Sequence, residues 1–475
     1  MAKIVLINPY PGVAHGINEA TLTPPLGLAY LAAVLEKNGH TVGIIDAHIL
    51  GSTADKVTAY FDGRPDLIGI SANIVTYRGA IACATQCKKV YRDAPIVFGG
   101  PYPSSLASKI LKDNTAVDAV VIGEGEYTMA EIADSLDKKN VFEGIRGVMY
   151  RFQGDCVSNK SRPLIDNLDE IPFPAYHLLP DLATYRTRSR ARPVAYIFSS
   201  RGCPFQCSFC NRNIFGAQWR AHSVDRVVND ITRLVEEYGV RQIDILDDNF
   251  TFDKARTHDI LDRLVERHYQ LSINLQNGVR IDLMDEELLR KMKQAGVFKI
   301  GFGIETANVA IQREVKKRVD LDKARSLVST ARSLGIVTVG FFIMGLPGDN
   351  AKSMKETIDY IIRLDPHVAN ITLCVPFPGT ELFEAVKREG VFLEDVEHGI
   401  DTGFFGDRVF FTLGSMKREE ILSYFRKAYW HFYMRPSKVL DVARTIKSFQ
   451  ELKWLLNVSR DIMFRRFGRR LLRRT

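Results

Sequence analysis

The sequence predicts an α/β protein: a doubly wound parallel sheet, then a partial barrel of six strand–helix units, then a helical C-terminal region. Three observations predict this fold class. Short apolar runs alternate with helical patterns through the first third of the chain and again from residue 193 onward, as in parallel sheets covered by helices. Turns rich in glycine or acidic residues follow many of these runs. Strand patterning then ends near Met416.

Composition and charge exclude several classes of protein. The 475 residues are 46% hydrophobic and 25% charged, which is ordinary for a folded globular chain. The longest apolar stretches, Leu26–Leu35 and Ile336–Leu346, are too short to span a bilayer. The N-terminal residues MAKIVLINP are too short for a secretory signal. We therefore expect a cytoplasmic protein.

The first third of the chain predicts the doubly wound sheet. In such a sheet, a ligand lies beyond the carboxyl ends of the strands, where the strand order reverses. The expected strands are Lys3–Ile7, Val42–Asp46, Leu67–Ile70, Ile96–Phe98 and Ala119–Ile122, and the expected helices are Leu26–Lys37, Ala54–Phe61, Tyr77–Tyr91, Ser104–Leu111 and Thr128–Leu136.

The turns at the carboxyl ends of these strands are rich in small residues. Small residues let the backbone approach a ligand closely, and four such turns on one edge predict a binding face for a large ligand. The residues of this predicted rim are Asn8, Pro9, Leu26, Gly27, Ser71, Asn73, Gly99, Gly100, Pro101, Gly123, Glu124, Gly125 and Glu126.

Four segments carry a family resemblance: LINP at the start, PPLGLAYLAAVLEKNGH, the GGPYPS loop and the VIGEGE loop. With them, residues 1–148 resemble the cobalamin-binding (B12) domain that precedes many radical SAM enzymes. The resemblance implies a flavodoxin-like, Rossmann-like sheet of strand order 2-1-3-4-5, with cobalamin bound at the predicted rim.

One further match is misleading. Residues 46–51, DAHILG, spell the D-x-H-x-x-G pattern by which some cobalamin proteins supply a histidine to cobalt. In those proteins the pattern follows the first strand, whereas here it follows the second. His48 is therefore expected to lie away from the corrin, which would leave the lower face of cobalt with water or no protein ligand.

A connector, residues 149–192, leads to a cysteine motif. A strand at Val194–Ser199 is followed at once by Cys203, Cys207 and Cys210. Three thiolates within eight residues can hold an iron–sulfur cluster and leave one iron open to a small molecule. A zinc site is the alternative, but structural zinc takes four ligands, and the fourth would have to be distant, such as Cys156 or Cys374.

The C-x3-C-x2-C spacing, with Phe209 before the last cysteine, resembles the radical SAM superfamily. The resemblance implies that SAM chelates the open iron of a [4Fe–4S] cluster, and that residues 193–415 form a partial (β/α)6 barrel with its site at the carboxyl ends of the strands. Further expected strands are Gln242–Leu246, Leu271–Asn274, Phe298–Ile304, Val337–Met344 and Asn370–Val375, and helices include His222–Tyr238, Ala255–Arg267 and Glu286–Gln294.

The strand ends of this barrel carry groups suited to SAM. The resemblance implies that Asp248 and Asn249 accept hydrogen bonds from its ammonium. Arg280 could pair with its carboxylate, since a guanidinium matches a carboxylate bidentately, and Glu305 with its ribose or ammonium. Gly345 begins a segment that resembles the adenine-contacting one, although Gly348 and Asp349 replace the usual final glutamate. Asp349 is expected to cap the next helix.

The resemblance implies a cobalamin-dependent methyltransferase that acts on an unactivated carbon through a 5′-deoxyadenosyl radical and methylcobalamin, with an electron donor such as flavodoxin or ferredoxin. No catalytic side chain is assigned, and no motif selects among small-molecule and lipid substrates. The alternatives are a cobalamin-type radical cyclase or rearrangement enzyme, a tRNA-modifying methylthiotransferase, and a non-catalytic corrin or iron–sulfur carrier. The methylthiotransferase is disfavoured because the first domain has only Cys83 and Cys87.

The C-terminal region, residues 416–475, is expected to be helical and is strongly basic. It carries 16 of the 64 lysines and arginines but only 5 of the 56 acidic residues, so the net charge of +8 belongs to this region. Ser459–Thr475 could form a basic amphipathic helix on an anionic membrane surface or a solvated tail, whereas nucleic acid is favoured only by charge.

Overall fold

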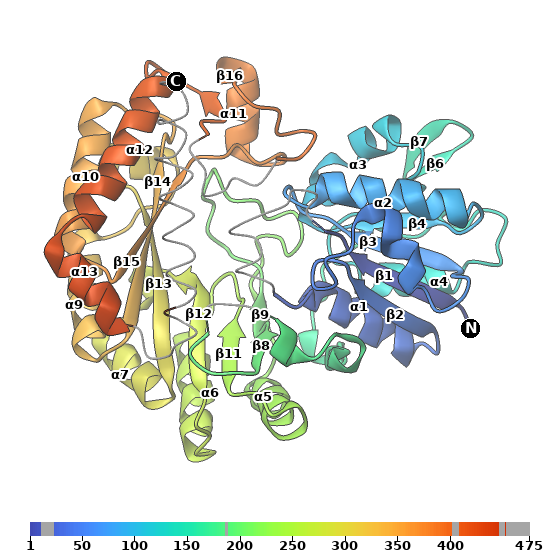
Figure 1. Cartoon of the computed structure of the whole chain (residues 1–475), viewed down its shortest axis with the longest axis horizontal. Coiled ribbons are helices and arrows are strands. Elements are labelled where there is room, and N and C mark those ends of the chain that lie inside the picture. Colours follow the sequence, from blue (N-terminus) through green and yellow to red (C-terminus); the bar gives the residue numbers. More distant parts are fainter. Residues whose placement is uncertain (11–22, 186–188, 401–407, 446–451, 453–475) are drawn as a thin grey trace.

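Two open sheets lie side by side in the computed structural model, which describes residues 1–10, 23–185, 189–400, 408–445 and 452. The first sheet and its helices are drawn in blue and cyan in Figure 1, and the second in green to orange. The carboxyl ends of the strands in both sheets carry the predicted functional residues, so the arrangement of the two sheets decides the geometry of the site.

The first sheet has the predicted strand order, extended at one edge. Its order is β2-β1-β3-β4-β5-β6-β7, with β1 to β5 parallel and β6 and β7 antiparallel. The flavodoxin-like order 2-1-3-4-5 is therefore confirmed. The strands are β1 (Lys3–Asn8), β2 (Thr41–Asp46), β3 (Leu67–Ser71), β4 (Ile96–Gly99), β5 (Ala119–Val121), β6 (Val148–Phe152) and β7 (Asp155–Ser158).

The β6–β7 hairpin lies in the segment that the sequence pattern assigns to the connector. Its two-residue turn is Gln153-Gly154, with φ of 51° and 91°. Left-handed conformations at both turn residues match the twist of the flanking strands. Since glutamine is not among the residues that usually mark such a turn, the sequence pattern does not reveal this hairpin.

Helices cover both faces of the first sheet. The helices are α1 (Leu26–Lys37), α2 (Tyr77–Val90), α3 (Pro101–Asp113) and α4 (Glu126–Ala133). Ile4 and Leu6 of β1 pack in one core with helices α1 and α4, whereas Val5 and Ile7 pack in a second core with α2 and α3. Successive side chains of a strand point to opposite faces of the sheet, which explains this alternation. The segment Ala54–Phe61, expected as a helix, forms a 3-10 helix at Ala54–Tyr60.

The second sheet is the expected six-stranded partial barrel. Its order is β15-β14-β13-β12-β11-β8, and all neighbouring strands are parallel. The strands are β8 (Val194–Ile197), β11 (Gln242–Ile245), β12 (Ser272–Val279), β13 (Val297–Glu305), β14 (Val337–Met344) and β15 (Val368–Leu373).

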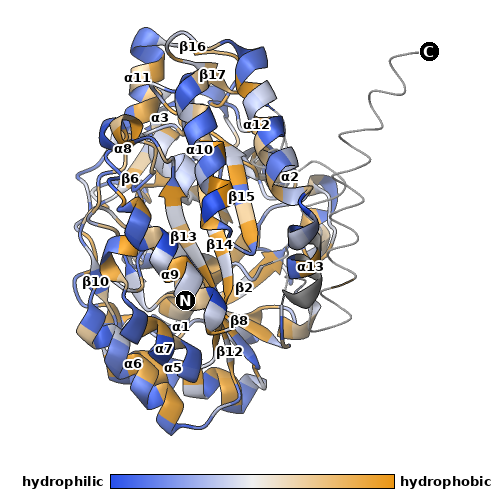
Figure 2. Cartoon of the chain, turned by 90° about the vertical axis from the view of Figure 1, so that its left-hand side faces the viewer, coloured by the Kyte–Doolittle hydropathy of each residue, from blue (hydrophilic) through white to orange (hydrophobic). Residues whose placement is uncertain are grey.

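Amphipathic helices cover the outside of the barrel. Figure 2 shows the hydrophobic strands β14 and β15 among helices with many hydrophilic residues. These helices are α5 (Val224–Tyr238), α6 (Lys254–Glu266), α7 (Glu286–Gln294), α9 (Leu321–Ser333) and α10 (Ala351–Leu364). Helices α8 (Val309–Glu314) and α11 (Glu381–Glu389) instead bury residues in the core that they share with α2 and α3. The short strands β16 (Val391–Phe392) and β17 (Phe411–Thr412) form a hairpin.

Two glycines shape the barrel interior. A Cβ atom added to Gly301 of β13 would lie 2.4 Å from the ring of Phe341 on β14, and one added to Gly278 of β12 would lie 2.9 Å from it. These glycines therefore leave the space that the Phe341 ring fills.

The C-terminal region is helical as expected, with α12 (Arg418–Tyr433) and α13 (Pro436–Thr445). Helix α12 covers β15, the last strand of the open barrel. The hydroxyl of Tyr433 lies 3.1 Å from the nitrogen and 2.9 Å from the oxygen of Ala369, and that of Tyr429 donates to the Ile371 oxygen at 2.8 Å. Tyrosine hydroxyls thus bind edge groups that a further strand would otherwise bind.

A buried lysine fastens α13 to the barrel. Lys438 donates to the Pro366 carbonyl at 2.8 Å and pairs with Asp365 and Asp441, both at 3.0 Å. The predicted basic helix at Ser459–Thr475 lies outside the described residues. None of the described helices is long and apolar enough to cross a membrane.

We expect Tyr433→Phe to destabilise the barrel. Without the hydroxyl, the amide and carbonyl of Ala369 are left without this partner, and an unsatisfied buried group costs about 1–3 kcal/mol. Thermal unfolding followed by circular dichroism should show a lower Tm than in the wild type. Tyr424→Phe is the matched control on the same helix, because the Tyr424 ring contacts Lys427 and phenylalanine keeps this ring contact. Equal Tm values for the wild type and Tyr433→Phe would contradict the edge role.

Candidate active site

The three cysteines lie on one loop at the carboxyl end of β8. This loop, residues 202–219, is called the cluster loop below. Strands β9 (Ser200–Arg201) and β10 (Arg220–Ala221) pair antiparallel and close its base. Gly202 has φ of 83°, and a Cβ atom added there would lie 2.2 Å from the Gln218 oxygen. Only glycine therefore lets the loop close on itself at this point.

The thiols suit a metal cluster. Cys203 and Cys207 are half-buried and Cys210 is exposed. Burial raises the pKa of Cys203, and the nearby Asp248 carboxylate and Cys207 add to this effect, so thiolates here need a positive partner such as a metal. In the described chain, no three His, Cys, Asp or Glu side chains are grouped to hold a single ion. A cubane instead binds its thiolates on separate irons.

The acidic residues after β11 fasten the base of the cluster loop. The buried carboxylate of Asp247 accepts hydrogen bonds from the Ser199 amide and hydroxyl, both at 2.6 Å, and from the Ser200 hydroxyl at 2.5 Å. Asp248 accepts from the Gly202 amide at 3.1 Å, beside Cys203. The amide nitrogen of the buried Asn249 side chain has no partner among the described residues, so it remains available to a ligand.

Arg280 reaches the cluster loop from the end of β12. Its guanidinium lies 3.7 Å from the ring centroid of Phe205, which stands between the first two cysteines. It also donates to Asp282 at 2.6 Å and to the Lys317 carbonyl at 2.9 Å. Its buried Nε has no partner in the described part of the chain. Arg280 is thus held at the position from which it could meet an anionic ligand.

A largely but not fully buried lysine that the sequence pattern does not single out, Lys317, lies beside Glu305. The ammonium of Lys317 is 3.1 Å from the Glu305 carboxylate. Burial alone would lower the pKa of Lys317, yet this pKa is raised because Glu305 and Cys207 lie nearby. A Cβ atom added to Gly303 would lie 2.9 Å from the Lys317 nitrogen. The site therefore holds a cation and an anion side by side.

The segment Val315–Val319 contacts the cluster loop through its backbone carbonyls. The Ser208 amide donates to the Val315 carbonyl at 3.1 Å, and the Cys207 sulfur lies 4.0 Å from the Lys316 carbonyl. Lys316 and Arg318 have φ of 57° and 50°, and Glu305 has φ of 70°. Left-handed non-glycine residues are strained and concentrate at functional sites. This strain is the signal that marks Lys317, and it exists only in the folded chain.

Gly345 and Asp349 form the turn after β14. One carboxylate oxygen of Asp349 accepts from the amides of Gly345 and Leu346, both at 3.0 Å, and the other from the Ser353 hydroxyl at 2.7 Å. Asn350 caps α10, so the prediction that Asp349 is the cap is wrong. Its carboxylate is better placed to hold the turn, because two amides point at it.

Two other predicted groups lie at this end of the barrel. Cys374, named above as a distant alternative ligand for zinc, follows β15 and is buried, and burial raises its pKa, with Asp349 and Glu305 adding to the effect. Phe209 is partly buried against the core that joins α2 and α3 to the end of the barrel. The predicted SAM residues therefore converge on the barrel end that carries the cluster loop.

The predicted rim residues lie together at the carboxyl edge of the first sheet or at the starts of α1, α3 and α4. An added Cβ atom at Gly27 or Gly99 would meet open space within 4 Å, and one at Gly123 would lie 3.9 Å from the Ile214 oxygen of the cluster loop. The backbone is thus open to a large ligand at these points.

Other rim residues make structural contacts. Leu26 is buried in the core. The Asn8 amide donates to Asp46 at 2.9 Å, and Asn73 accepts from the amides of Val75 and Thr76, both at 2.9 Å. Glu124 and Glu126 bind arginines. These five side chains are engaged within the protein.

His48 follows β2, the edge strand. Its ring is 5.8 Å from that of Tyr10. Strand β2 lies on the far side of β1 from β3, which is the position assumed in the sequence argument.

A cavity of about 220 Å³ lies between the cluster loop and residues 379–381 at the end of the barrel. The Asn211 and Asn213 side chains donate to the Ser105 hydroxyl of α3 at 3.0 and 2.7 Å, and Asn211 also donates to the Pro378 carbonyl at 3.1 Å. The cluster loop thus bridges the first domain and the end of the barrel. The cavity is lined by Cys207, Ser208, Cys210, Arg212, Asn213, Gly216, Ala217, Gly379, Thr380 and Glu381.

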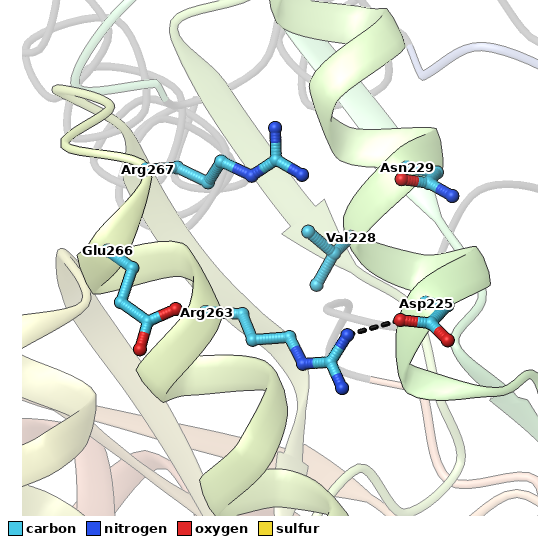
Figure 3. Close-up of a pocket in the computed structure, with 6 residues that line it drawn as sticks. All are labelled: Asp225, Val228, Asn229, Arg263, Glu266 and Arg267. Atoms are coloured by element: carbon cyan, nitrogen blue, oxygen red, sulfur yellow. Dashed lines mark hydrogen bonds and ion pairs between the residues drawn. The ribbon is translucent and has the colours of Figure 1, made fainter.

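A second cavity, of about 250 Å³, lies between α5 and α6 on the outside of the barrel (Figure 3). Arg263 crosses it to pair with Asp225. It contains none of the predicted site residues, and its polar lining is that of a groove between two surface helices.

Comparison with known proteins agrees with this geometry. Residues 197–361 match the family model of the radical SAM superfamily, and residues 15–133 match that of the B12 binding domain. An uncharacterised methyltransferase of Pyrococcus horikoshii is 34% identical over 92% of this chain and 94% of its own length. The anaerobic magnesium-protoporphyrin IX monomethyl ester cyclase of Rubrivivax gelatinosus is 28% identical over 76% of this chain and 66% of its own.

The fold is also that of a solved enzyme. The radical S-adenosylmethionine methyltransferase TsrM of Kitasatospora setae, solved with cobalamin and a [4Fe–4S] cluster, superimposes with a TM-score of 0.71 over 92% of this chain and 90% of its own, at 17% identity. The predicted fold class and resemblance are confirmed, and with them the prediction of an enzyme whose cofactors are a [4Fe–4S] cluster, SAM and cobalamin. The chain belongs to the cobalamin-dependent radical SAM family.

Proposed function

We propose that this enzyme is a methyltransferase that methylates an unactivated carbon of a small-molecule substrate. One observation carries the proposal: a single loop holds three cysteines and bonds both to the first domain, at Ser105, and to the end of the barrel, at Pro378. A ligand of the first domain and a ligand of the barrel would therefore share one space, as transfer of a group between them requires.

We assign the cluster to Cys203, Cys207 and Cys210, and the SAM site to the strand ends around them. Arg280, stacked on Phe205, would orient the carboxylate of SAM, while Asp248 and Glu305 would meet its ammonium or ribose. The unpartnered amide nitrogen of Asn249 is a donor, so it would meet an oxygen of SAM rather than its ammonium. Lys317 would add a second positive charge beside Glu305, so that a zwitterion meets both signs of charge. Gly345 would present its backbone to the adenine, and Phe209, which precedes Cys210, is assigned to the SAM site.

The first domain is assigned to cobalamin. The open backbone at Gly27, Gly99 and Gly123 would admit the corrin, with Pro9, Ser71, Gly100, Pro101 and Gly125 on the same rim. When bound, the cluster with SAM supplies a 5′-deoxyadenosyl radical and cobalamin supplies the methyl group. The chain itself binds and orients these groups and excludes water. Because β6 and β7 belong to the first sheet, we place the end of the first domain at Ser158 rather than at residue 148, which leaves 159–192 for the connector. The predicted limits 193–415 and 416–475 are kept for the barrel and the C-terminal region, and flavodoxin or ferredoxin is the expected electron donor.

A radical cyclase is the second candidate, since a cyclase is among the relatives. SAM with an isotope-labelled methyl group distinguishes the two. A methyltransferase incorporates the label into its product, as detected by mass spectrometry, whereas a cyclase forms product without label. Unlabelled product would therefore sink the methyl-transfer proposal.

We expect Cys203→Ala to abolish formation of 5′-deoxyadenosine while the protein still binds cobalamin. Removal of one of three thiolates leaves the cluster without its full ligand set, whereas the rim of the first domain is untouched. The measurement is chromatography of reaction products after anaerobic reconstitution, with corrin quantified by absorbance. Cys83→Ala, in helix α2, is the control and should retain 5′-deoxyadenosine formation. Unchanged SAM cleavage in Cys203→Ala would refute the cluster assignment.

We expect Asp349→Asn to change how stability depends on pH. Burial raises the pKa of Asp349 from 3.8 to about 6, against hydrogen bonds from Ser353, Leu346 and Gly345 that lower it. The folded protein thus keeps this proton to a higher pH than the unfolded chain. The folded state should therefore lose stability as the pH rises from about 4 to about 6, by up to about 3 kcal/mol.

Asparagine can keep the contacts of this turn, with its oxygen accepting from both amides and its nitrogen donating to Ser353. In cluster-free protein, the Tm of the wild type should fall relative to that of Asp349→Asn as the pH rises across this range. Above this range, the difference between the two Tm values should stay constant. Asp253→Asn is the control, because asparagine caps a helix as well as aspartate, and Asp253 caps α6. A constant Tm difference between Asp349→Asn and the wild type would contradict the prediction.

A further inference from the structure

Both arms of the cluster loop carry an arginine to the same glutamate of the first domain. Arg201 ends β9 and Arg220 begins β10, and the two residues pair directly across the base of the loop. The Arg201 guanidinium lies 2.9 Å from one oxygen of Glu124, and that of Arg220 lies 2.9 Å from the other. One carboxylate therefore joins the two ends of the loop.

The surroundings make this group of charges a single unit. Arg201 is only 2% exposed and lies between the rings of Tyr30 and Phe215, 5.3 and 5.1 Å from their centroids. Its second amino group pairs with Glu126 at 2.7 Å. Two arginines and two glutamates balance in charge. Loss of any one member would leave a buried charge without compensation, which is strongly unfavourable, so the members hold their positions together.

The network also includes the connector and the rest of the loop. Glu124 accepts from the Ile165 amide at 2.8 Å, and Arg220 donates to the carbonyls of Ile165 and Phe215 at 2.6 and 3.0 Å. Phe215 belongs to the cluster loop, and Arg220 begins β10, the strand to which the loop returns. A shift of Glu124 would therefore move or unpair groups on both arms.

Glu124 and Glu126 stand in the turn after β5, beside Gly123 and Gly125 of the rim. Gly123 has no side chain to fill this space, and its amide donates to the Ser104 hydroxyl of α3 at 3.1 Å. A ligand that orders this turn must also order the two carboxylates, because they are only one and three residues from Gly123.

We propose that Arg201 and Arg220 are positioning residues that couple cobalamin binding to the order of the cluster loop. Bound cobalamin holds the turn after β5, the turn holds Glu124 and Glu126, and these hold the base of the loop that carries the cysteines. The inference rests on the proposed assignment of cobalamin to the rim. By linkage, an assembled cluster then strengthens cobalamin binding by the same factor as cobalamin strengthens cluster retention.

The test is the affinity for hydroxocobalamin, measured by fluorescence quenching under anaerobic conditions. Wild-type protein with its cluster should bind hydroxocobalamin at least about five-fold more tightly than protein stripped of iron by a chelator. A factor of about five is at the lower end of the usual range of allosteric coupling. Conversely, saturating hydroxocobalamin should slow loss of the cluster to the chelator by a comparable factor, followed by the bleaching of its absorbance.

Arg201→Lys should still bind hydroxocobalamin but lose most of the difference between cluster-loaded and iron-free protein. A single ammonium keeps the charge and yet cannot bridge two carboxylates as a guanidinium does. Should Arg201→Lys fail to fold by circular dichroism, Glu126→Gln serves instead, since it keeps the shape of the side chain and removes one partner of Arg201. Arg226→Lys, which alters an ion pair with Asp230 on α5, is the matched control and should keep the full difference.

Equal hydroxocobalamin affinities in cluster-loaded and iron-free wild type would overturn the coupling. So would a full difference retained in the folded Arg201→Lys or Glu126→Gln variant. Absence of hydroxocobalamin binding to wild-type protein in either state is a separate outcome, because it removes the proposed rim assignment, and the coupling with it.

Discussion

The buried contact of Arg201 and Arg220 with Glu124 is the interaction on which the rest of the structure depends. It joins the base of the cysteine loop to the turn after β5, two places far apart in sequence. With Asp247 fastening Ser199 and Ser200 from the barrel side, the loop is fixed at its base from both domains. The thiols therefore project from a rigid frame although the loop itself has little regular structure, and rigid support is what a cofactor site requires.

Much of the fold and part of the site follow from local sequence. Short apolar runs that alternate along the chain with helical patterns predict β1 to β5 and the six barrel strands, because a buried strand shows as a run of consecutive apolar residues. The cysteine motif is equally local. Glu124 and Glu126 show the limit: their place on the rim is predictable, but their partners lie 75 to 96 residues away, and no pattern around them reveals a buried ion network. Their carboxylates bind Arg201 and Arg220 at the base of the cluster loop and do not face a ligand.

Lys317 shows the same limit for a different reason. It follows a short helix, and its entry into the site depends on left-handed backbone at Lys316 and Arg318, which residues of this type rarely adopt. Such strain persists only where surrounding contacts impose it, here the bonds of Val315 to Ser208 and of Lys317 to Arg280. A cation within electrostatic reach of the cysteines therefore arises from tertiary structure alone.

The tyrosines of α12 have a consequence for how the protein is made. Strand β15 leaves the ribosome some sixty residues before Tyr433, which is several seconds at about 5–20 residues per second. Throughout that interval the strand offers bare amide and carbonyl groups to any neighbouring nascent chain. Arrival of α12 thus covers the edge of each newly synthesised barrel, a role of these two hydroxyls that is separate from the chemistry of the site.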